Sequence, residues 1–475
     1  MNRFCAVVTT CALAAALLTP LPSLADGPAH DGDMLTFRNA SGVAATFSMT
    51  GGIDRSNPFF QKLGTNGRSC ETCHQPSAGW SLTPENVRAR FNRTRGRDPL
   101  FRLNDGANSP NADVSSFKAR ASAYSMLLTK GLIRVGMALP ANAEFDLIDV
   151  DDPYGYASAA ELSLFRRPLP SANLRFLSTV MWDGRETFAD PLSKDCIFGT
   201  TSCFASLRFD LADQANGATL GHAQGAVELT QAQRDAIVDF EMGLFVAQIY
   251  DDDAKHLTSH GALGGPVPLA FQTTYFGIND VVSGDYRTAA PFDPRVFSIY
   301  DAWDKSTAMK EQDSRTVDAR RAVLRGQSIF NTKPIRISGV KGLNDELGVA
   351  VLDGTCTTCH NTPGGGNHSV PAPLDIGISD AARSTPDLPL YVLRNRATGE
   401  TITTSDPGRA MVTGKWKDIG RFKGPILRGL AARPPYFHNG LAANLAAVVD
   451  FYNDRFNIGF TAQEREDLIA FLRTL

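Results

Sequence analysis

The sequence predicts a mainly α-helical protein in which two similar units follow one another and carry long ordered loops. Three observations support this fold class. A Cys-x-x-Cys-His motif occurs twice, at residues 70–74 and 356–360. A stretch with apolar residues at helical spacing precedes each motif, and another one closes each half of the chain. Glycine and proline are frequent, with 41 and 27 of 475 residues, which favours extensive loops.

The first 25 residues are typical of a secretory signal peptide. A positive charge at Arg3 precedes a short apolar run over 7–18, and Ser23-Leu24-Ala25 offers the small residues of a cleavage site. A membrane anchor is the alternative, but the run is too short to span a bilayer and prolines follow at 20 and 22. We therefore expect an exported, periplasmic protein with residues 1–25 removed and with no membrane span.

Length and charge narrow the class of protein. A chain of 475 residues is long enough for two or three domains. Its formal net charge is −3, so no basic surplus points to a nucleic-acid partner.

The expected units are an N-terminal domain over 26–249, a linker over 250–315 and a C-terminal domain over 316–475. Amphipathic helices are predicted at 57–64 and 323–330, just before the two motifs. The closing helices are predicted at 230–240 and 461–471, and each begins with a Thr that suits a helix N-cap. The linker is rich in Gly, Pro and Asp, and its His256 and His260 are interpreted as solvated rather than as a metal site.

The two motifs, Cys70-Glu-Thr-Cys73-His74 and Cys356-Thr-Thr-Cys359-His360, match the attachment site of a c-type haem. Two thiols at this spacing each form a thioether to a haem vinyl group, and the following histidine becomes the proximal iron ligand. A thioredoxin-like pair would need a βαβ context, and a zinc site would leave both histidines without a role. The sequence thus predicts two covalently bound haem c groups, and the fold becomes two cytochrome c-like haem domains in tandem.

Two further cysteines, Cys196 and Cys203, lie seven residues apart outside these motifs. In an oxidising compartment we expect them to form a small disulfide loop, with two buried free thiols as the alternative.

Three segments resemble the bacterial di-haem cytochrome c peroxidases and their relatives, which include the di-haem enzyme that matures methylamine dehydrogenase. They are the block 421–440 (RFKGPILRGLAARPPYFHNG), the block 408–414 (GRAMVTG), and the pair 182–185 (WDGR) with 212–217 (ADQANG). The sequence departs from the family pattern at Gly429 and Asn439, and it carries an insertion around 100–160 that could cap the first haem or form a docking surface. The resemblance implies a calcium ion between the domains, and a homodimer is a further expectation.

The distal side of each haem decides its chemistry, because a sixth protein ligand favours electron transfer and an open position permits peroxide chemistry. Met411 is the predicted distal ligand of the second haem, with a packed core methionine as the alternative. His368 is expected to lie too near the motif for that role, and His438 is expected to order the C-terminal block through hydrogen bonds. For the first haem, His222 is the candidate ligand or acid–base group, and Glu228 is a weaker alternative.

The resemblance also places Trp182 between the haems, where an indole can relay an electron; an anchoring aromatic at the domain interface is the plainer interpretation. The expected function is a di-haem oxidoreductase that reduces hydrogen peroxide to water with electrons from a small soluble cytochrome or copper protein. The alternatives are a di-haem electron-transfer cytochrome and a related enzyme that oxidises a protein or organic substrate.

Overall fold

The structure is a computed structural model that describes residues 34–187, 202–305 and 313–475. The predicted signal peptide and Cys196 lie outside these residues, and the side chain of Cys203 is not described. The expected signal cleavage and the expected disulfide therefore stay predictions.

The prediction of a mainly α-helical fold is wrong. Helices account for 33% of the chain and strands for 18%, so the protein mixes α and β structure. The strands were missed because they are short, and because some of them pair with strands that are distant in sequence. The three-stranded sheet, for example, joins residues 145–151 to residues 390–395.

The strands form four separate antiparallel sheets in the described residues. The largest has the order β1-β2-β6-β7, the second has the order β11-β10-β4, and the remaining strands form two pairs, β3-β5 and β8-β9. Their bounds are β1 Met34–Asn39, β2 Gly42–Ser48, β3 Ile133–Met137, β4 Phe145–Asp151, β5 Leu162–Arg166, β6 Leu244–Asp251, β7 Lys255–His256, β8 Ile335–Ser338, β9 Val351–Gly354, β10 Leu390–Asn395 and β11 Thr401–Thr404.

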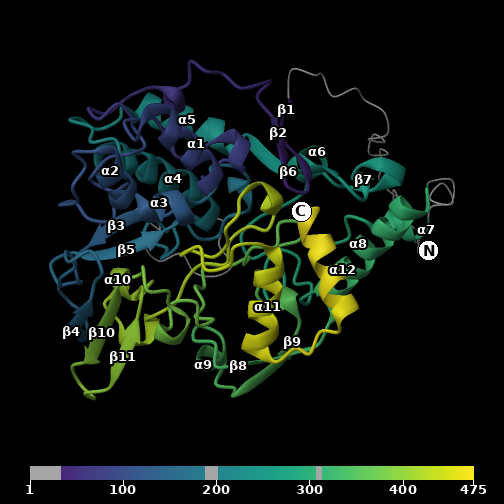
Figure 1. The fold of residues 1–475 in the computed structure, drawn as a ribbon. Coiled ribbons are helices and arrows are strands. Elements are labelled where there is room, and N and C mark those ends of the chain that lie inside the picture. The colour runs from purple at the N-terminus through teal and green to yellow at the C-terminus, as the bar shows by residue number, and fades with distance from the viewer. Residues whose placement is uncertain (1–33, 188–201, 306–312) are drawn as a thin grey trace, which may run out of the picture.

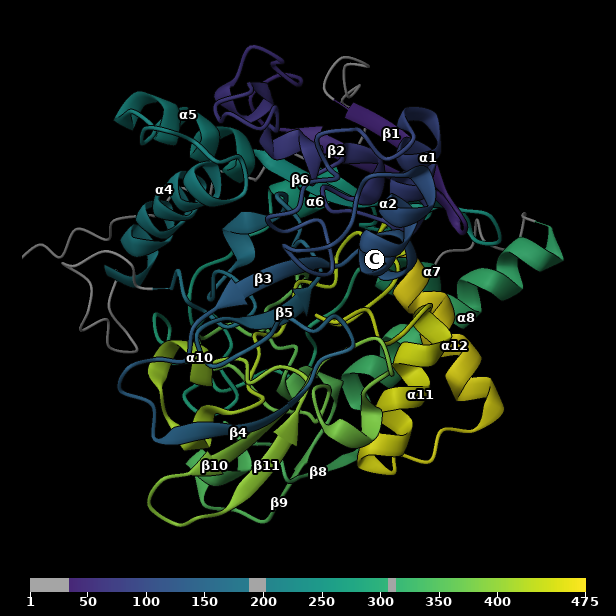
Figure 2. The same ribbon diagram turned by 60° about the vertical axis from the view of Figure 1, so that its left-hand side comes forward.

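Two groups of α-helices surround the two motifs. Helices α1 to α5 gather around the first motif, while α8, α11 and α12 pack together near the second (Figures 1 and 2). The bounds are α1 Pro84–Thr94, α2 Phe117–Ala123, α3 Ser125–Lys130, α4 Ser202–Gly221, α5 Gln231–Met242, α6 Pro266–Ala270, α7 Asp301–Lys305, α8 Ser314–Thr332, α9 Asn344–Leu347, α10 Ala410–Thr413, α11 Leu445–Phe456 and α12 Ala462–Arg473.

Both closing helices begin where the sequence predicts. Thr230 caps α5 and Thr461 caps α12, and each forms a reciprocal capping box with the residue three positions on, Gln233 or Glu464. In the second half α12 packs along α8, and Val323, Phe330 and Phe471 meet in one apolar core.

The helix expected before the first motif does not form. Only a short 3-10 helix, η1 Pro58–Phe60, is present there, whereas the second half has the long helix α8. The chain leaves η1 to pass close to the loop after α4, where a Cβ on Gly64 would lie 1.8 Å from the carbonyl oxygen of Ala223. Because the backbone passes so close to Ala223 at Gly64, the helix that the periodicity predicts over 57–64 is not formed.

The insertion connects the two halves of the protein. Its strand β4 pairs with β10 of the C-terminal half, and the two lie side by side below the helices in Figures 1 and 2. The segment expected as a linker is also closely packed, since Phe297, Tyr300 and Trp303 are buried in the same core as α8 and α12.

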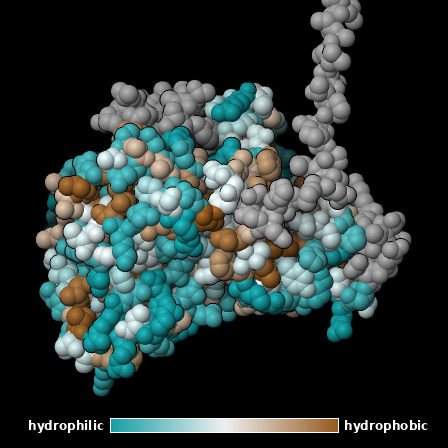
Figure 3. All heavy atoms as spheres, turned by 90° about the horizontal axis from the view of Figure 1, so that it is seen from above, coloured by the Kyte–Doolittle hydropathy of each residue, from teal (hydrophilic) through white to brown (hydrophobic). Residues whose placement is uncertain are grey.

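The surface is mainly polar on the face shown in Figure 3, where hydrophobic residues are scattered among hydrophilic ones. Within residues 34–187, 202–305 and 313–475, no helix combines the length and the apolar character needed to cross a bilayer.

Candidate functional site

The first Cys-x-x-Cys-His motif lines a largely apolar cavity in the N-terminal half. Cys70 begins the 3-10 helix η2 Cys70–Thr72, and the reciprocal bonds between Ser69 and Thr72 fix that turn. Burial is the main cause that raises the pKa of both thiols, that of Cys73 to about 11.

His74 is oriented as an iron ligand would be. Its Nδ1 lies 3.2 Å from the carbonyl oxygen of Trp80, which leaves Nε2 as the nitrogen free to bind a metal. Trp80 is fully buried against Phe59 and Phe240, and its indole donates a hydrogen bond to Thr46. Burial lowers the pKa of His74 to about 4, so the ring is neutral and its lone pair is available.

The second motif lines a separate cavity with the same design. Thr355 caps the 3-10 helix η8 Cys356–Thr358, and Nδ1 of His360 lies 2.6 Å from the carbonyl oxygen of Gly366. Burial again lowers the pKa of the histidine to about 4. Gly366 is required here, because it has a φ of +68° and a Cβ on it would lie 2.8 Å from the Phe297 ring. Both sites therefore fit a haem by their thiols, their histidine and their apolar lining.

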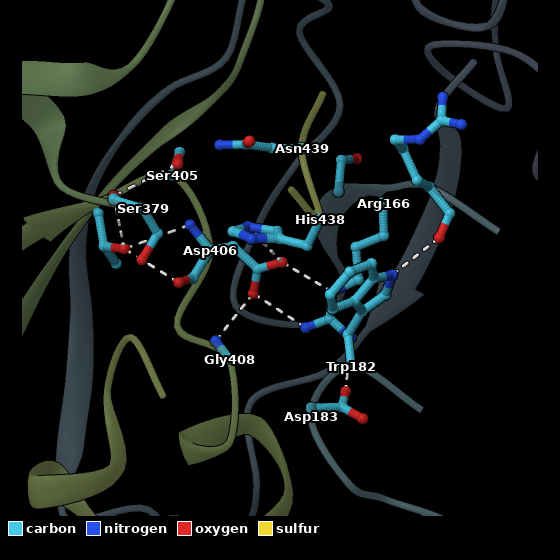
Figure 4. A network of polar contacts seen from close by, with 12 residues as sticks. Arg166, Trp182, Asp183, Ser379, Ser405, Asp406, Gly408, His438 and Asn439 are labelled. Carbon is cyan, nitrogen blue, oxygen red and sulfur yellow. Dashed lines mark hydrogen bonds and ion pairs between the residues drawn. The ribbon is translucent and has the colours of Figure 1, made fainter. Parts of the chain in front are cut away.

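One wall separates the two cavities and is lined on both sides by the same residues. They come from residues 167–170, from Trp182 and from the segment around Lys423 and Pro425. The indole Nε1 of Trp182 donates a 2.8 Å hydrogen bond to the carbonyl oxygen of Arg167, and its ring lies 6.2 Å from that of His438 (Figure 4). Trp182 thus lines both cavities, and its predicted place between two haems stays a prediction.

A buried ionic network holds Trp182 in place. The Arg166 guanidinium donates to Asp406 at 2.7 and 2.9 Å and to Asp183, the neighbour of Trp182, at 2.5 Å. All three charged side chains are almost inaccessible (Figure 4). Although burial acts to raise it, the Arg166 charge holds the pKa of Asp183 at about 2, so the network stays ionised.

His222 lines the first cavity together with His74. Its Nδ1 lies 2.6 Å from Oδ2 of Asp105, whose other oxygen accepts a 2.5 Å bond from Arg68. Burial acts to raise the pKa of Asp105, but the His222 bond and the Arg68 charge hold it below its ordinary value. The pair resembles an acid–base histidine oriented by a carboxylate, with Nε2 left free. Glu228, the weaker alternative, is exposed, pairs with Arg234 and is not among the described lining residues.

The structure does not bring Met411 to either cavity. Helix α10 buries this side chain in a cluster with Phe145, Leu164 and Tyr391, and Met411 is not among the described residues that line the second cavity. The role of Met411 as an iron ligand stays a prediction, and its burial in this cluster does not favour that role.

Two other histidines lie near the second motif. His368 is buried with Nδ1 2.9 Å from the carbonyl oxygen of Cys359. His438 lines the second cavity and stacks on Phe422, but its buried Nε2 has no hydrogen-bond partner among the described residues and lies 4.0 Å from Asp406. The hydrogen bonds expected from this side chain are therefore not seen.

Sequence reasoning missed the charged residues of the shared wall. Arg167 and Lys423 line both cavities, and Arg433 lines the second. Their only signal was position: Arg167 precedes Pro-Leu-Pro, and the other two lie inside the family-like block. No group of three or more His, Cys, Asp or Glu side chains in the described part of the chain could hold a metal ion, and the expected calcium ion stays a prediction.

Comparison with known proteins gives related sequences over part of the chain. No known protein-family profile matches it. The cytochrome-c peroxidase IdrP1 of Pseudomonas sp. (strain SCT) is 33% identical over 154 residues, which cover 28% of this chain and 40% of the relative. The cytochrome c551 peroxidase of Nitrosomonas europaea is 33% identical over 134 residues, which cover 28% of this chain and 34% of the relative. The match thus spans about two fifths or less of these relatives.

Two solved structures are similar over most of the chain at low identity. One is a MauG-like protein associated with microbial copper homeostasis, with 16% identity, a TM-score of 0.35, and coverage of 88% of this chain and 87% of the other. The other is a diheme peroxidase from Burkholderia thailandensis, with 15% identity, a TM-score of 0.29, and coverage of 93% and 94%.

Proposed function

The predicted resemblance to the di-haem cytochrome c peroxidase family is confirmed by these relatives, and from that premise we propose that this protein is a periplasmic di-haem oxidoreductase that reduces hydrogen peroxide to water. The observation that carries the proposal is the pair of cavities, each with a Cys-x-x-Cys-His motif and both lined by Trp182. The electrons would come from a small soluble cytochrome or copper protein.

In this proposal the four motif cysteines hold two haems covalently, and His74 and His360 are the proximal ligands. Each bound haem would supply an iron that exchanges single electrons. Nδ1 of each histidine is bonded to a backbone carbonyl, which fixes the ring and directs Nε2 away from that carbonyl. Covalent attachment agrees with the export predicted from residues 1–25.

His222 is the proposed acid–base group of the first site. With Nδ1 on Asp105, its Nε2 takes a proton from the bound peroxide and returns it to the departing oxygen, so that two protons and two electrons convert one peroxide into two waters. Asp105 is the positioning residue, since its Oδ2 lies 2.6 Å from Nδ1 of His222 and fixes the orientation of the ring.

Trp182 is the proposed relay between the two sites. Its indole ring lines both cavities, and the Arg166 network and the bond to the Arg167 carbonyl hold it rigidly. A fixed aromatic group in the wall shortens the distance over which an electron must pass from the second site to the first.

The test is peroxide turnover by the half-reduced protein with a reduced cytochrome as donor. We expect rapid turnover that requires prior reduction of one haem, and a loss of about 10²- to 10⁴-fold in His222→Ala. His256→Ala is the matched control, because His256 is exposed and is not among the described lining residues.

Two results would contradict the proposal. Absence of turnover, with both irons low-spin in every redox state, would favour a di-haem electron-transfer cytochrome. Slow turnover with an accessible high-spin haem would favour an enzyme that oxidises a protein or organic substrate.

A further inference from the structure

Three cations at the shared wall have no anionic partner among the described residues: Arg167 and Lys423 are buried, and Arg433 is half-buried. Arg167 and Lys423 are 5% and 6% exposed and line both cavities, while Arg433 lines the second. In the described residues none of them bonds to a carboxylate. Their hydrogen bonds end on the backbone carbonyl oxygens of Lys130, Leu82 and Arg433 for Arg167, of Thr179 for Lys423, and of Ile426 and Arg428 for Arg433.

The lining of the second cavity offers no compensating charge. Among its described residues there is no Asp or Glu. The first cavity has two carboxyl groups, but Asp105 is paired with Arg68 and His222, and burial raises the pKa of Glu241 to about 8, which keeps it neutral. The wall therefore carries positive charge that the described lining residues do not balance.

An unbalanced buried charge is costly, and its surroundings show the strain. Burial, together with the Arg433 charge, lowers the pKa of Lys423 to about 7 and that of Arg167 to about 9. The Nε of Arg433 is buried without a hydrogen-bond partner in the described residues. Buried cations of this kind are normally paired with an anion. A bound ligand with carboxylate groups would supply the missing negative charge.

We propose that Arg167, Lys423 and Arg433 form one cationic cluster that would hold haem propionate carboxylates, with Arg167 and Lys423 serving both cavities and Arg433 serving the second. The inference rests on the haem binding proposed above. Propionates lie on the opposite edge of the ring from the vinyl groups that the cysteines hold. The cluster then sets the redox potential of both irons, since positive charge near a haem stabilises its reduced form.

The residues predict different effects at the two haems. Lys423 lines both cavities, so Lys423→Met is expected to lower both midpoint potentials, and Lys423→Arg is expected to restore them toward the wild-type values. Arg433 lines only the second cavity, so Arg433→Gln is expected to lower mainly the potential of the second haem.

The measurement is a spectroelectrochemical titration of the haem-loaded variants, with haem content determined for each. Arg428→Gln is the matched control, because Arg428 is 2% exposed and bonds to backbone carbonyls but is not among the described residues lining either cavity. Its potentials should stay near the wild-type values. Equal shifts in the control and in Lys423→Met would overturn the inference.

A free anion from solution is the competing occupant of the cluster. If the cluster held one, phosphate added to the wild-type protein at constant ionic strength would shift the potentials, and the inference would be overturned. Unchanged potentials in Lys423→Met and Arg433→Gln would overturn it as well while leaving the peroxidase proposal intact. A wild-type protein without haem would instead contradict both.

Discussion

Two buried carboxyl groups line the first cavity, and their surroundings push their pKa values in opposite directions. Asp105 is held ionised by the His222 bond and the Arg68 charge. Burial raises the pKa of Glu241 from 4.5 to about 8, and among the described residues only a hydrogen bond with Ser171 acts to lower it. The two carboxyl groups can therefore have different roles. The ionised Asp105 orients His222, whereas the neutral Glu241 can carry a proton.

The raised pKa of Glu241 predicts a pH-dependent stability. The unfolded chain loses this proton near its ordinary value of 4.5, whereas the folded protein keeps it up to about 8. The folded state therefore binds more protons in this window, and its stability should fall as the pH rises from about 4.5 to about 8. Glu241→Gln should flatten that slope in denaturant titrations at several pH values. An unchanged slope in the variant would contradict the assignment.

At the scale of elements, the packing of α8 on α12 depends on a glycine. A Cβ on Gly326 would lie 2.0 Å from the carbonyl oxygen of Asp467 and 2.7 Å from Cβ of Phe471, so the two helices would have to separate. Because the clash involves backbone, a rotamer change cannot relieve it.

Gly326→Ala should therefore destabilise the protein by about 1–3 kcal/mol, the usual cost of overpacking. Gly217→Ala is the matched comparison, since Gly217 lies exposed in α4 with no atom within 4 Å of its added Cβ. There the substitution should stabilise by about 0.5–1 kcal/mol, because alanine favours the helix. Chemical denaturation of the haem-loaded variants measures the change in the free energy of unfolding for each substitution. If both substitutions changed this free energy in the same direction, the close approach at Gly326 would be contradicted.

The same elements indicate how far the sequence could predict the structure. The closing helices were predictable because their caps, Thr230 and Thr461, act on residues only three positions away. The motif turns and the ring orientation of His74 and His360 follow from equally local contacts. The strand β4 could not be found this way, because its partner β10 lies about 240 residues further along the chain.

In the candidate site, too, features set by local sequence were predictable and features set by long-range packing were not. Met411 was predicted because it is the only methionine after Cys359 and lies in a segment that resembles the family's ligand segment. The direction of its side chain, however, depends on how α10 packs against β4 and β10. The cations of the shared wall carry no pattern of their own, and they become informative only when the fold buries them between two cavities.

At the scale of the whole molecule, the two motif-bearing halves share structure and do not merely adjoin. Strand β4 of the insertion completes the sheet of β10, where Tyr391 and Leu393 are fully buried. The Arg166–Asp406 pair and the bond from Lys423 to the Thr179 carbonyl also join the halves. The wall between the cavities therefore exists only when both halves are present.

This interdependence predicts that residues 316–475, the proposed C-terminal domain, will not fold alone. The fragment lacks β4, one of the two partner strands of β10, and the buried rings of Phe297 and Trp303 that complete the core of α8 and α12. We expect a protease-sensitive fragment with little bound haem after export, as measured by limited proteolysis and haem absorbance. Co-expression with residues 26–315 is the control, because it restores β4 and those rings, and it should recover haem binding. A protease-resistant fragment that holds haem by itself would contradict the shared core and would indicate two separable domains.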